Sequence, residues 1–281
     1  MKNTTTLLVI DMETTSDVIA DFAENALKNN THLICLIIAL APISSISSYA
    51  VSPYGDTLMP NDWDEILNSS RKALLDRKSE IEALFALIGV SADVQHFHCS
   101  TADIKNIVAR SAKVCDIAHI APNLSVNSGV MHEVAYGVLF KSPIALMLNA
   151  YPSKEVDQVF IAWDNSAAAS RAVHVALPYF RAARNIVIAC FDTVATVEGN
   201  VVDPGTDIAA WLSHHGFPVT ISQFPTGGRE IALCILDRAK EQGADLVVMG
   251  AYGHSRMIEA IFGGTTRTIM EQTELPILFA H

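Results

Sequence analysis

The sequence predicts an α/β fold built twice, as two tandem doubly wound domains that pack together, each with a five-stranded parallel sheet. Three observations lead to this prediction. Short apolar segments alternate with helical patterns, half of the 281 residues are apolar while 17% are charged, and the order of segments in the first half recurs in the second. This composition supplies a large core and excludes intrinsic disorder. Strands that alternate with helices are typical of a parallel sheet covered by helices.

The repeat begins with two apolar strands, residues 7–11 and 160–164, that each end in an aspartate. A turn rich in Ser, Thr and Ala follows each strand, and then a helical pattern near residues 16–29 and 167–182. Later segments match in the same order: helices at 104–113 and 231–240, strands at 116–120 and 245–249, and closing strands at 142–146 and 275–279. Segments that keep the same order in both halves, while the loops between them differ in length, indicate a duplicated domain. We therefore expect domains of residues 1–149 and 150–281, joined through the short polar stretch 149–154.

Within this scheme, the runs 32–40, 185–191 and 246–249 are almost continuously apolar. Such runs are expected where helices cover both faces of a parallel sheet. The first half also predicts a long helix in which Leu67, Leu74, Ile81 and Ile88 recur every seven residues. We interpret this stripe as packing on the chain's own sheet, with a groove for a partner as the alternative.

Composition excludes several classes of protein. The formal net charge of −11 repels phosphate backbones, so we expect no nucleic-acid partner. No apolar run approaches the ~20 residues of a membrane span, and the first residues lack the apolar core of a signal peptide. Five scattered cysteines without C-x-x-C spacing are interpreted as free thiols, and the ten histidines lack the spacing of a metal site. We expect a cytoplasmic protein with no metal and no membrane contact.

A glycine-rich loop carries the chemistry of a binding site. It follows the strand at 246–249 and ends in small and hydroxyl residues: Gly250, Gly253, Gly263, Gly264, Thr265 and Thr266. Ligands bind beyond the carboxyl ends of parallel strands, glycines let backbone N–H groups approach an anion, and a helix start favours phosphate. Turn formation is the alternative interpretation of these glycines. The absence of G-x-x-x-x-G-K-[ST] and G-x-G-x-x-G motifs excludes a P-loop NTPase and disfavours a dinucleotide site.

The spacing Gly250-x2-Gly253-x9-Gly263 resembles the nucleotide loop of the universal stress protein family, whose pattern is G-x2-G-x9-G-(S/T). The turn Asp164-Asn165-Ser166 resembles that family's Asp-Gly-Ser turn, and residues 275–278 resemble its final strand. The resemblance covers residues 153–281 and, more weakly, 1–149, so the chain is similar to a tandem member. It implies a Rossmann-like, adenine-nucleotide-hydrolase-like fold that binds ATP or another adenine nucleotide, with or without Mg²⁺.

By the same resemblance, Asp164 lies near the adenine-ribose end of the nucleotide and the glycine loop wraps the phosphates. The residues expected at the nucleotide are Asp164, Asn165, Met249, Gly250, Gly253, His254, Gly263, Gly264, Thr265 and Thr266. His254 is interpreted either as a phosphate contact or as a solvated loop residue, and Arg267 either as a phosphate contact or as half of a surface ion pair. Two residues depart from the family pattern: Gly264 replaces a Ser or Thr, and Asn165 replaces a glycine.

The first half departs further from the pattern. Its corresponding loop, residues 121–131, is four residues shorter and retains one glycine, Gly129. Val130 and Met131 fall opposite Gly263 and Gly264, and Glu13 adds negative charge where phosphates would approach. We expect this site to be degenerate and this half to serve as a packing partner for the other. The family resemblance also implies a homodimer.

These features predict a nucleotide-dependent regulator of a stress response with one site, in the C-terminal domain. No base or metal set accompanies the loop, so we expect no dedicated enzyme and at most slow ATP hydrolysis. One alternative is an interaction protein of the same fold that has lost nucleotide binding. Another is a small-molecule sensor that uses the same cleft, with Met249, Tyr252 and Ile261 as apolar lining.

Overall fold

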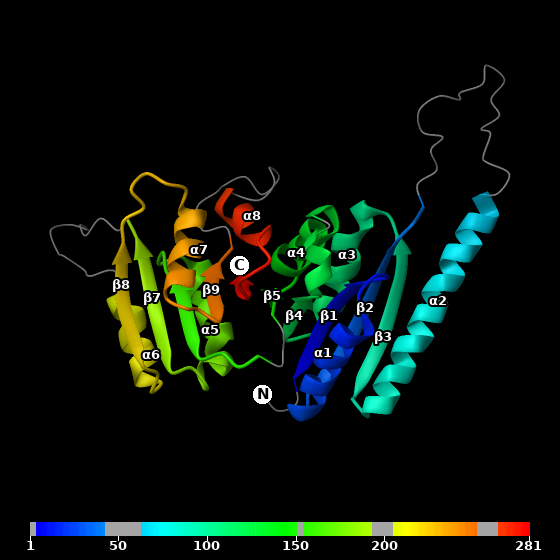
Figure 1. Ribbon diagram of the computed structural model, residues 1–281, viewed down its shortest axis with the longest axis horizontal. Coiled ribbons are helices and arrows are strands. Elements are labelled where there is room, and N and C mark those ends of the chain that lie inside the picture. Colours follow the sequence, from blue (N-terminus) through cyan, green and yellow to red (C-terminus); the bar gives the residue numbers. More distant parts are fainter. Residues whose placement is uncertain (1–3, 43–62, 127, 151–153, 193–204, 252–263) are drawn as a thin grey trace, which may run out of the picture.

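The computed structural model describes residues 4–42, 63–126, 128–150, 154–192, 205–251 and 264–281. Ten strands in these ranges form one sheet in the order β3-β2-β1-β4-β5-β10-β9-β6-β7-β8, with helices packed against it (Figure 1). Each half contributes five neighbouring strands. The predicted α/β fold is therefore confirmed.

The first half alternates strands and helices in the predicted order. Its elements are β1 (Thr5–Asp11), α1 (Ser16–Lys28), β2 (His32–Leu40), α2 (Trp63–Ile88), β3 (Ala92–Cys99), α3 (Thr101–Ala112), β4 (Ile117–Ile120), the 3-10 helix η2 (Pro122–Val126), α4 (Ser128–Lys141) and β5 (Ala145–Leu148). The second half contains β6 (Gln158–Ala162), α5 (Ala167–Phe180), β7 (Asn185–Phe191), α6 (Thr206–His214), β8 (Val219–Phe224), α7 (Ile231–Glu241), β9 (Leu246–Gly250), α8 (Gly264–Met270) and β10 (Ile277–Ala280).

The two halves meet at an antiparallel pair of strands, β5 and β10, in which Met147 lies opposite Leu278. All other neighbouring strands of the sheet are parallel. Successive residues of a strand point to opposite faces. Accordingly, Leu146 and Phe279 belong to one buried cluster, whereas Met147 and Leu278 belong to another. Both apolar layers thus continue across the junction.

The long helix α2 packs on α1 and β3 through part of its length. Leu74, Ile81 and Phe85 of its apolar stripe are buried, and Ile88 packs partly buried against the same core. Nearer its start, Leu67 is half-buried and Ile66 is exposed. The C-terminal two-thirds of the helix therefore fit the interpretation of the stripe as internal packing.

A single buried side chain, Asn149, links the halves directly after β5. Its Oδ1 accepts a hydrogen bond from Ser125 Oγ at 3.1 Å, and its Nδ2 donates to the carbonyl of Gln272 at 2.8 Å. Ser125 belongs to η2 of the first half, and Gln272 precedes β10 of the second. The start of the stretch expected to be a simple linker is thus part of the packed interior, because the buried amide satisfies groups from both halves.

Candidate functional site

The candidate site lies where the strand order of the second half reverses. From β6 the chain passes through α5 to β7 on one side, while β9 pairs with β6 on the other, with Ala162 opposite Met249. The carboxyl ends of two such strands form the crevice that binds ligands in open α/β sheets. Asp164 follows β6, and Gly250 ends β9. The fold thus brings the predicted aspartate turn and the start of the predicted glycine loop to neighbouring strands.

The turn after β6 is organised by its own side chains. Asp164 Oδ1 accepts a hydrogen bond from the Ser166 backbone N–H at 2.9 Å, and Ser166 Oγ caps α5 by accepting from the Ala169 N–H at 3.0 Å. Asn165 has a φ of 60°, the left-handed region that favours glycine. Asparagine is among the few other residues that adopt this conformation readily, so replacing the family's glycine preserves the turn. Both Asp164 and Asn165 are exposed.

Gly250 has a steric role in this crevice. A Cβ atom at this position would lie 2.5 Å from the backbone nitrogen of Ala169 and 2.8 Å from the carbonyl carbon of Ala168. Glycine therefore lets the end of β9 contact the first turn of α5 directly. The neighbouring Met249 is buried in the core. The next residue, Ala251, is held in place because its carbonyl accepts a hydrogen bond from His281 Nδ1 at 3.0 Å.

Helix α8 follows the glycine loop. Gly264 is exposed at its start, and among the described residues no atom would lie within 4 Å of a Cβ placed there. Thr265 is half-buried, whereas Thr266 is buried in the interior. Arg267 Nε contacts Glu271 Oε1 at 2.8 Å, which favours the interpretation of Arg267 as half of a surface ion pair.

Three predicted site residues, Gly253, His254 and Gly263, lie outside the described residues, as do Tyr252 and Ile261. The structure brings Asp164, Asn165 and Gly250 to the carboxyl ends of β6 and β9, and it buries Met249 in the core below them. Of the two predicted threonines, it leaves Thr265 partly accessible and places Thr266 in the interior.

A second carboxylate at this edge of the sheet was not predicted. Asp192 follows β7, and its oxygens accept hydrogen bonds from the Thr226 backbone N–H at 2.9 Å and from the Thr226 hydroxyl. These bonds hold the pKa of Asp192 below its ordinary value. The signal in the sequence is that Asp192 follows an apolar strand in the same way as Asp164. Its role here is to fix the turn that leads into α7.

The first half provides a natural comparison at the corresponding crevice between β1 and β4. Asp11 Oδ1 accepts hydrogen bonds from the backbone N–H of Glu13 at 3.0 Å, from the N–H and hydroxyl of Thr14, both at 2.8 Å, and from Asn123 Nδ2 at 2.8 Å. Arg77 adds a bond to the Thr14 carbonyl. Because Asn123 reaches across from η2, the aspartate and the loop after β4 hold each other in place.

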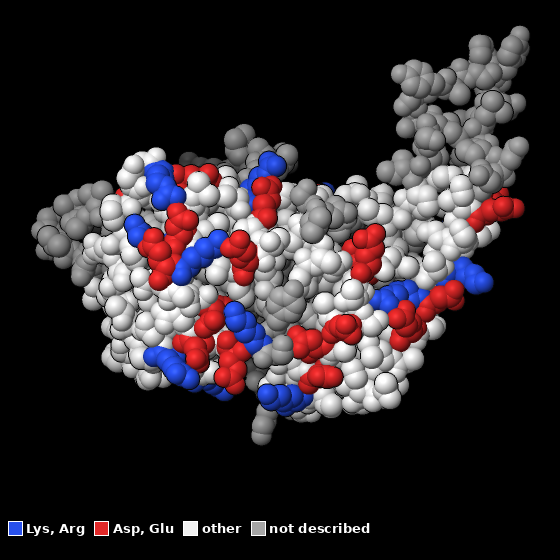
Figure 2. All heavy atoms as spheres, viewed as in Figure 1, with Lys and Arg blue, Asp and Glu red and all other residues white. Residues whose placement is uncertain are grey.

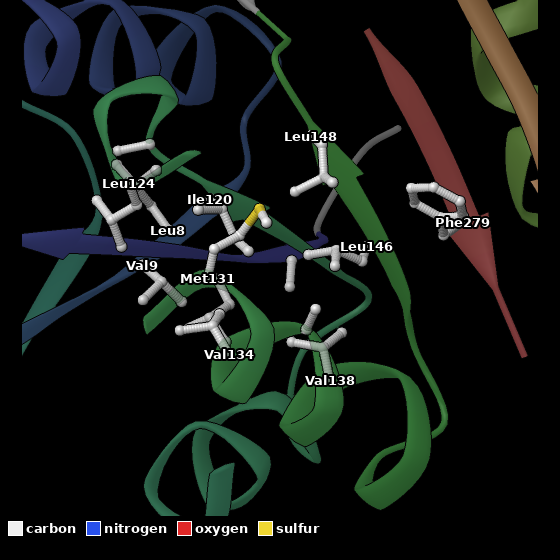
Figure 3. Packing of buried hydrophobic residues seen from close by; sticks show 14 of the residues in the cluster. Leu8, Val9, Ile120, Leu124, Met131, Val134, Val138, Leu146, Leu148 and Phe279 are labelled. Carbon is white, nitrogen blue, oxygen red and sulfur yellow. The ribbon is translucent and has the colours of Figure 1, made fainter. Parts of the chain in front are cut away.

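Apolar side chains fill the loop region beside that crevice. Leu124 of η2 and Met131 of α4 are fully buried, and Val130 is nearly so. Figure 3 shows Leu124 and Met131 directed towards the strands that carry Leu8 and Ile120. In the first half, Leu124, Val130 and Met131 of the segment that corresponds to the glycine loop are therefore part of the core.

The described ranges contain no cluster of three or more His, Cys, Asp or Glu side chains that could hold a metal ion. In those same parts of the chain, no helix has the length and apolar character needed to cross a membrane.

Comparison with known proteins shows which family the end of the chain is similar to. Residues 217–281 match the universal stress protein family, a stretch that runs from the residues before β8 to the end of β10. No curated protein matches the chain in sequence. Among solved structures, the chain is similar to a universal stress protein from Archaeoglobus fulgidus DSM 4304, with 15% identity and a TM-score of 0.63 over 99% of this chain and 96% of that one. It is also similar to a functionally unknown protein from Pseudomonas aeruginosa PAO1, with 12% identity and a TM-score of 0.52 over 98% and 92%.

The predicted resemblance to the universal stress protein family is thus confirmed by the family match in the second half of the chain. At these identities the two solved structures establish the fold, and they do so over nearly the whole chain.

Proposed function

We propose that this universal-stress-type chain binds one adenine nucleotide, ATP first among them, at the β6–β9 crevice, and acts as a nucleotide-dependent regulator of a cytoplasmic stress response. The domain division at residues 149–150 is part of this proposal. The C-terminal domain would hold the nucleotide, and the N-terminal domain would serve as its packing partner. The homodimer implied by the family resemblance would add a second copy of the same unit.

One observation carries the proposal: an exposed carboxylate, Asp164, lies beside a β9 backbone that leads through Gly250 into the glycine loop. The carboxylate can accept hydrogen bonds from ribose hydroxyls. The loop from Gly250 to Gly263 has the spacing of the family's nucleotide loop, and its backbone N–H groups would face the phosphates. Thr265, which is half-buried at the start of α8, would supply the hydroxyl that Gly264 lacks.

The proposed role is binding rather than turnover. Phosphoryl transfer needs a positioned nucleophile and a cation that stabilises the developing charge. Arg267 is the described basic residue nearest the loop in sequence, and it forms an ion pair with Glu271. Asp192 accepts hydrogen bonds from Thr226. Hydrolysis, if it occurs with Mg²⁺, is therefore expected to be slow.

An interaction protein that has lost nucleotide binding is the second candidate, and the burial of Thr266 favours it, because a hydroxyl predicted for the phosphates lies in the interior. A small-molecule sensor that uses the same crevice is the third.

Calorimetric titration with ATP and Mg²⁺ tests the proposal. We expect saturable binding with a stoichiometry of one, lost in Gly263→Glu and weakened about tenfold in Asp164→Ala, which corresponds to the loss of roughly one hydrogen bond to a charged group. The matched control is Asp11→Ala, which removes the equivalent carboxylate of the first half and should leave ATP affinity unchanged.

Two sites per chain would show that the first half also binds nucleotide. The absence of binding at millimolar ATP would reject the nucleotide proposal and favour the interaction protein.

A further inference from the structure

A groove of about 590 Å³ lies between the two halves, away from the β6–β9 crevice. It is bounded by α1, by the C-terminal end of α5, and by residues at or near the starts of β1, β4, β9 and β10. The candidate nucleotide site lies at the opposite ends of the strands. The groove is therefore a separate feature from the site of the proposed function.

The floor of the groove is apolar. Ile117, Met147 and Leu246 are each no more than 2% exposed, and they come from strands of both halves. Phe22 of α1 forms part of one wall. A floor of this kind favours the flat, apolar body of an organic ligand over a simple ion.

His119 of β4 is a buried polar group that faces this groove. The residue is 9% exposed and lines the groove, with its ring packed edge-on against Phe22 at 5.2 Å between centroids. Within the described parts of the chain, no group forms a hydrogen bond with its imidazole, and its ring nitrogens are not sealed from the groove. Burial lowers the pKa of His119 to about 4, so the ring is neutral at pH 7 and presents one donor and one acceptor. Such a group is costly to bury without a partner.

Tyr179 of α5 adds a second polar group from the other half. It is half-buried and lines the same groove, and no described residue forms a hydrogen bond with its hydroxyl. Burial raises the pKa of Tyr179 to about 12, so the group stays a neutral donor and acceptor at physiological pH. Each half thus contributes to the groove one polar group that no described residue satisfies, above an apolar floor.

The charges around the groove favour a cation. Its acidic lining residues are Asp21, Glu24, Glu155 and Asp245, against two basic ones, Lys28 and Lys154. Lys154 and Asp245 lie 3.7 Å apart and offset each other, which leaves an acidic excess. Figure 2 shows acidic side chains on both sides of the junction between the halves in the lower part of the view. A negative rim above a low-dielectric floor attracts cations and repels anions such as nucleotides.

We propose that this groove binds a small organic cation with a flat apolar body, whose N–H group donates a hydrogen bond to the neutral imidazole of His119. The apolar floor receives the ring of the ligand, the acidic rim offsets its charge, and the Tyr179 hydroxyl provides a second polar contact. A ligand bound here would contact both halves and would therefore depend on how they pack.

Three probes of nearly equal shape and different charge test the proposal: benzamidine, benzamide and benzoate, which are cationic, neutral and anionic at pH 7. Each is titrated into the full-length protein while the ring ¹⁵N signals of His119 are followed by NMR. We expect saturable binding of benzamidine in the millimolar range, a shift of the His119 ring nitrogens, and at least tenfold weaker binding of benzoate.

Two variants separate the contacts. His119→Phe keeps the packing against Phe22 but removes the acceptor, and it should weaken benzamidine about tenfold. Glu24→Gln, at an exposed rim position, should weaken benzamidine about threefold and leave benzamide unchanged. Glu65→Gln makes the same charge change on α2, outside the groove, and should have no effect.

The proposal is overturned if benzamidine shows no saturable binding, if benzoate binds as well as benzamidine, or if benzamidine binding is unchanged in His119→Phe. Circular dichroism and a urea titration of each variant establish that it is folded before its affinity is compared.

Discussion

The two halves of the sheet share an order of elements but differ at the crevice where the strand order reverses. In the first half, Asp11 accepts four hydrogen bonds, one of them from Asn123 across the crevice. In the second, Asp164 is exposed and its carboxylate accepts a bond from the Ser166 N–H. The same aspartate is thus bonded to the loop after β4 in one copy and exposed in the other. A duplicated scaffold can keep its fold while its sites diverge.

Aligning the aspartates before β4 and β9, Asp116 and Asp245, reveals two further exchanges. The second half has Gly250 where the first has Ala121, and Val248 where the first has His119. Gly250 permits a backbone contact with α5, and His119 faces the groove between the halves. These paired positions allow the comparison to be tested by exchanging residues between the halves.

The largest effect is expected from His119→Val at acid pH. In the unfolded chain this histidine takes up a proton near its ordinary pKa of 6.5, whereas in the fold burial lowers the pKa to about 4. The unfolded state therefore binds the proton first, and stability falls as the pH drops from about 6.5 to about 4. The histidine should cost about 3 kcal/mol of stability at the bottom of that window. Urea titrations at pH 7, 5.5 and 4 should show a flatter acid dependence in His119→Val.

The exposed histidine variant His214→Val serves as the control for His119→Val and should keep the wild-type pH dependence. An unchanged pH dependence in His119→Val would mean that this imidazole is protonated in the folded protein at pH 4–6.5.

Gly250→Ala should have the next largest effect, because its Cβ would lie 2.5 Å from the backbone nitrogen of Ala169. A backbone neighbour cannot move aside easily, and overpacking of this kind costs about 2 kcal/mol. The reverse exchange, Ala121→Gly, should cost about 1 kcal/mol through lost burial and added chain entropy. Urea denaturation measures both. Gly264→Ala is the control, because no described atom lies within 4 Å of the added Cβ, and it should change stability by less than about 0.5 kcal/mol.

Removing the two aspartates should separate stability from binding. Asp11→Ala leaves several donors without their acceptor and should cost about 2 kcal/mol. Asp164→Ala should cost less than about 1 kcal/mol, because the side chain is exposed and water replaces its bond to Ser166. Thermal denaturation should show the larger loss of stability in Asp11→Ala. The ATP titration should show the larger loss of affinity in Asp164→Ala. Equal losses of stability would contradict the difference between the two crevices.

The smallest effect is expected for Arg267→Gln. An exposed i, i+4 ion pair such as Arg267–Glu271 contributes about 0.3–0.5 kcal/mol, and its contribution falls with added salt. ATP affinity should be unchanged in this variant. A tenfold loss of affinity would instead identify Arg267 as a phosphate contact and would extend the nucleotide site onto α8.

Much of the fold is predictable because strands and helices leave local patterns. Residues 16–29 predict a helix that is found at Ser16–Lys28, and the apolar run at 32–40 is found as β2 with the same bounds. The Asp164 turn is also local, since Ser166 and Ala169 lie within a few residues of it.

Features that depend on distant residues could not be predicted in this way. Asn123 approaches Asp11 only because β1 and β4 are neighbours in the sheet, and Asn149 finds partners on both sides of the junction only once the halves have packed. The tight contact at Gly250 and the groove around His119 also require the assembled fold. In each case the sequence supplies the residue, and the tertiary arrangement decides its role.

The antiparallel pair of β5 and β10 has a consequence for how the molecule responds to dilution. Residues 149–157 are all that separates the end of β5 from the start of β6, so each half keeps its partner within reach at an effective concentration in the millimolar range. Two separate chains that paired through the same strands would dissociate at low expression levels, whereas these halves remain together. The tether also removes the need for both copies to stay identical, because at the β5–β10 pair each half meets the other half rather than its own duplicate. That freedom allows one copy to gain buried groups such as His119 while the other keeps an exposed aspartate.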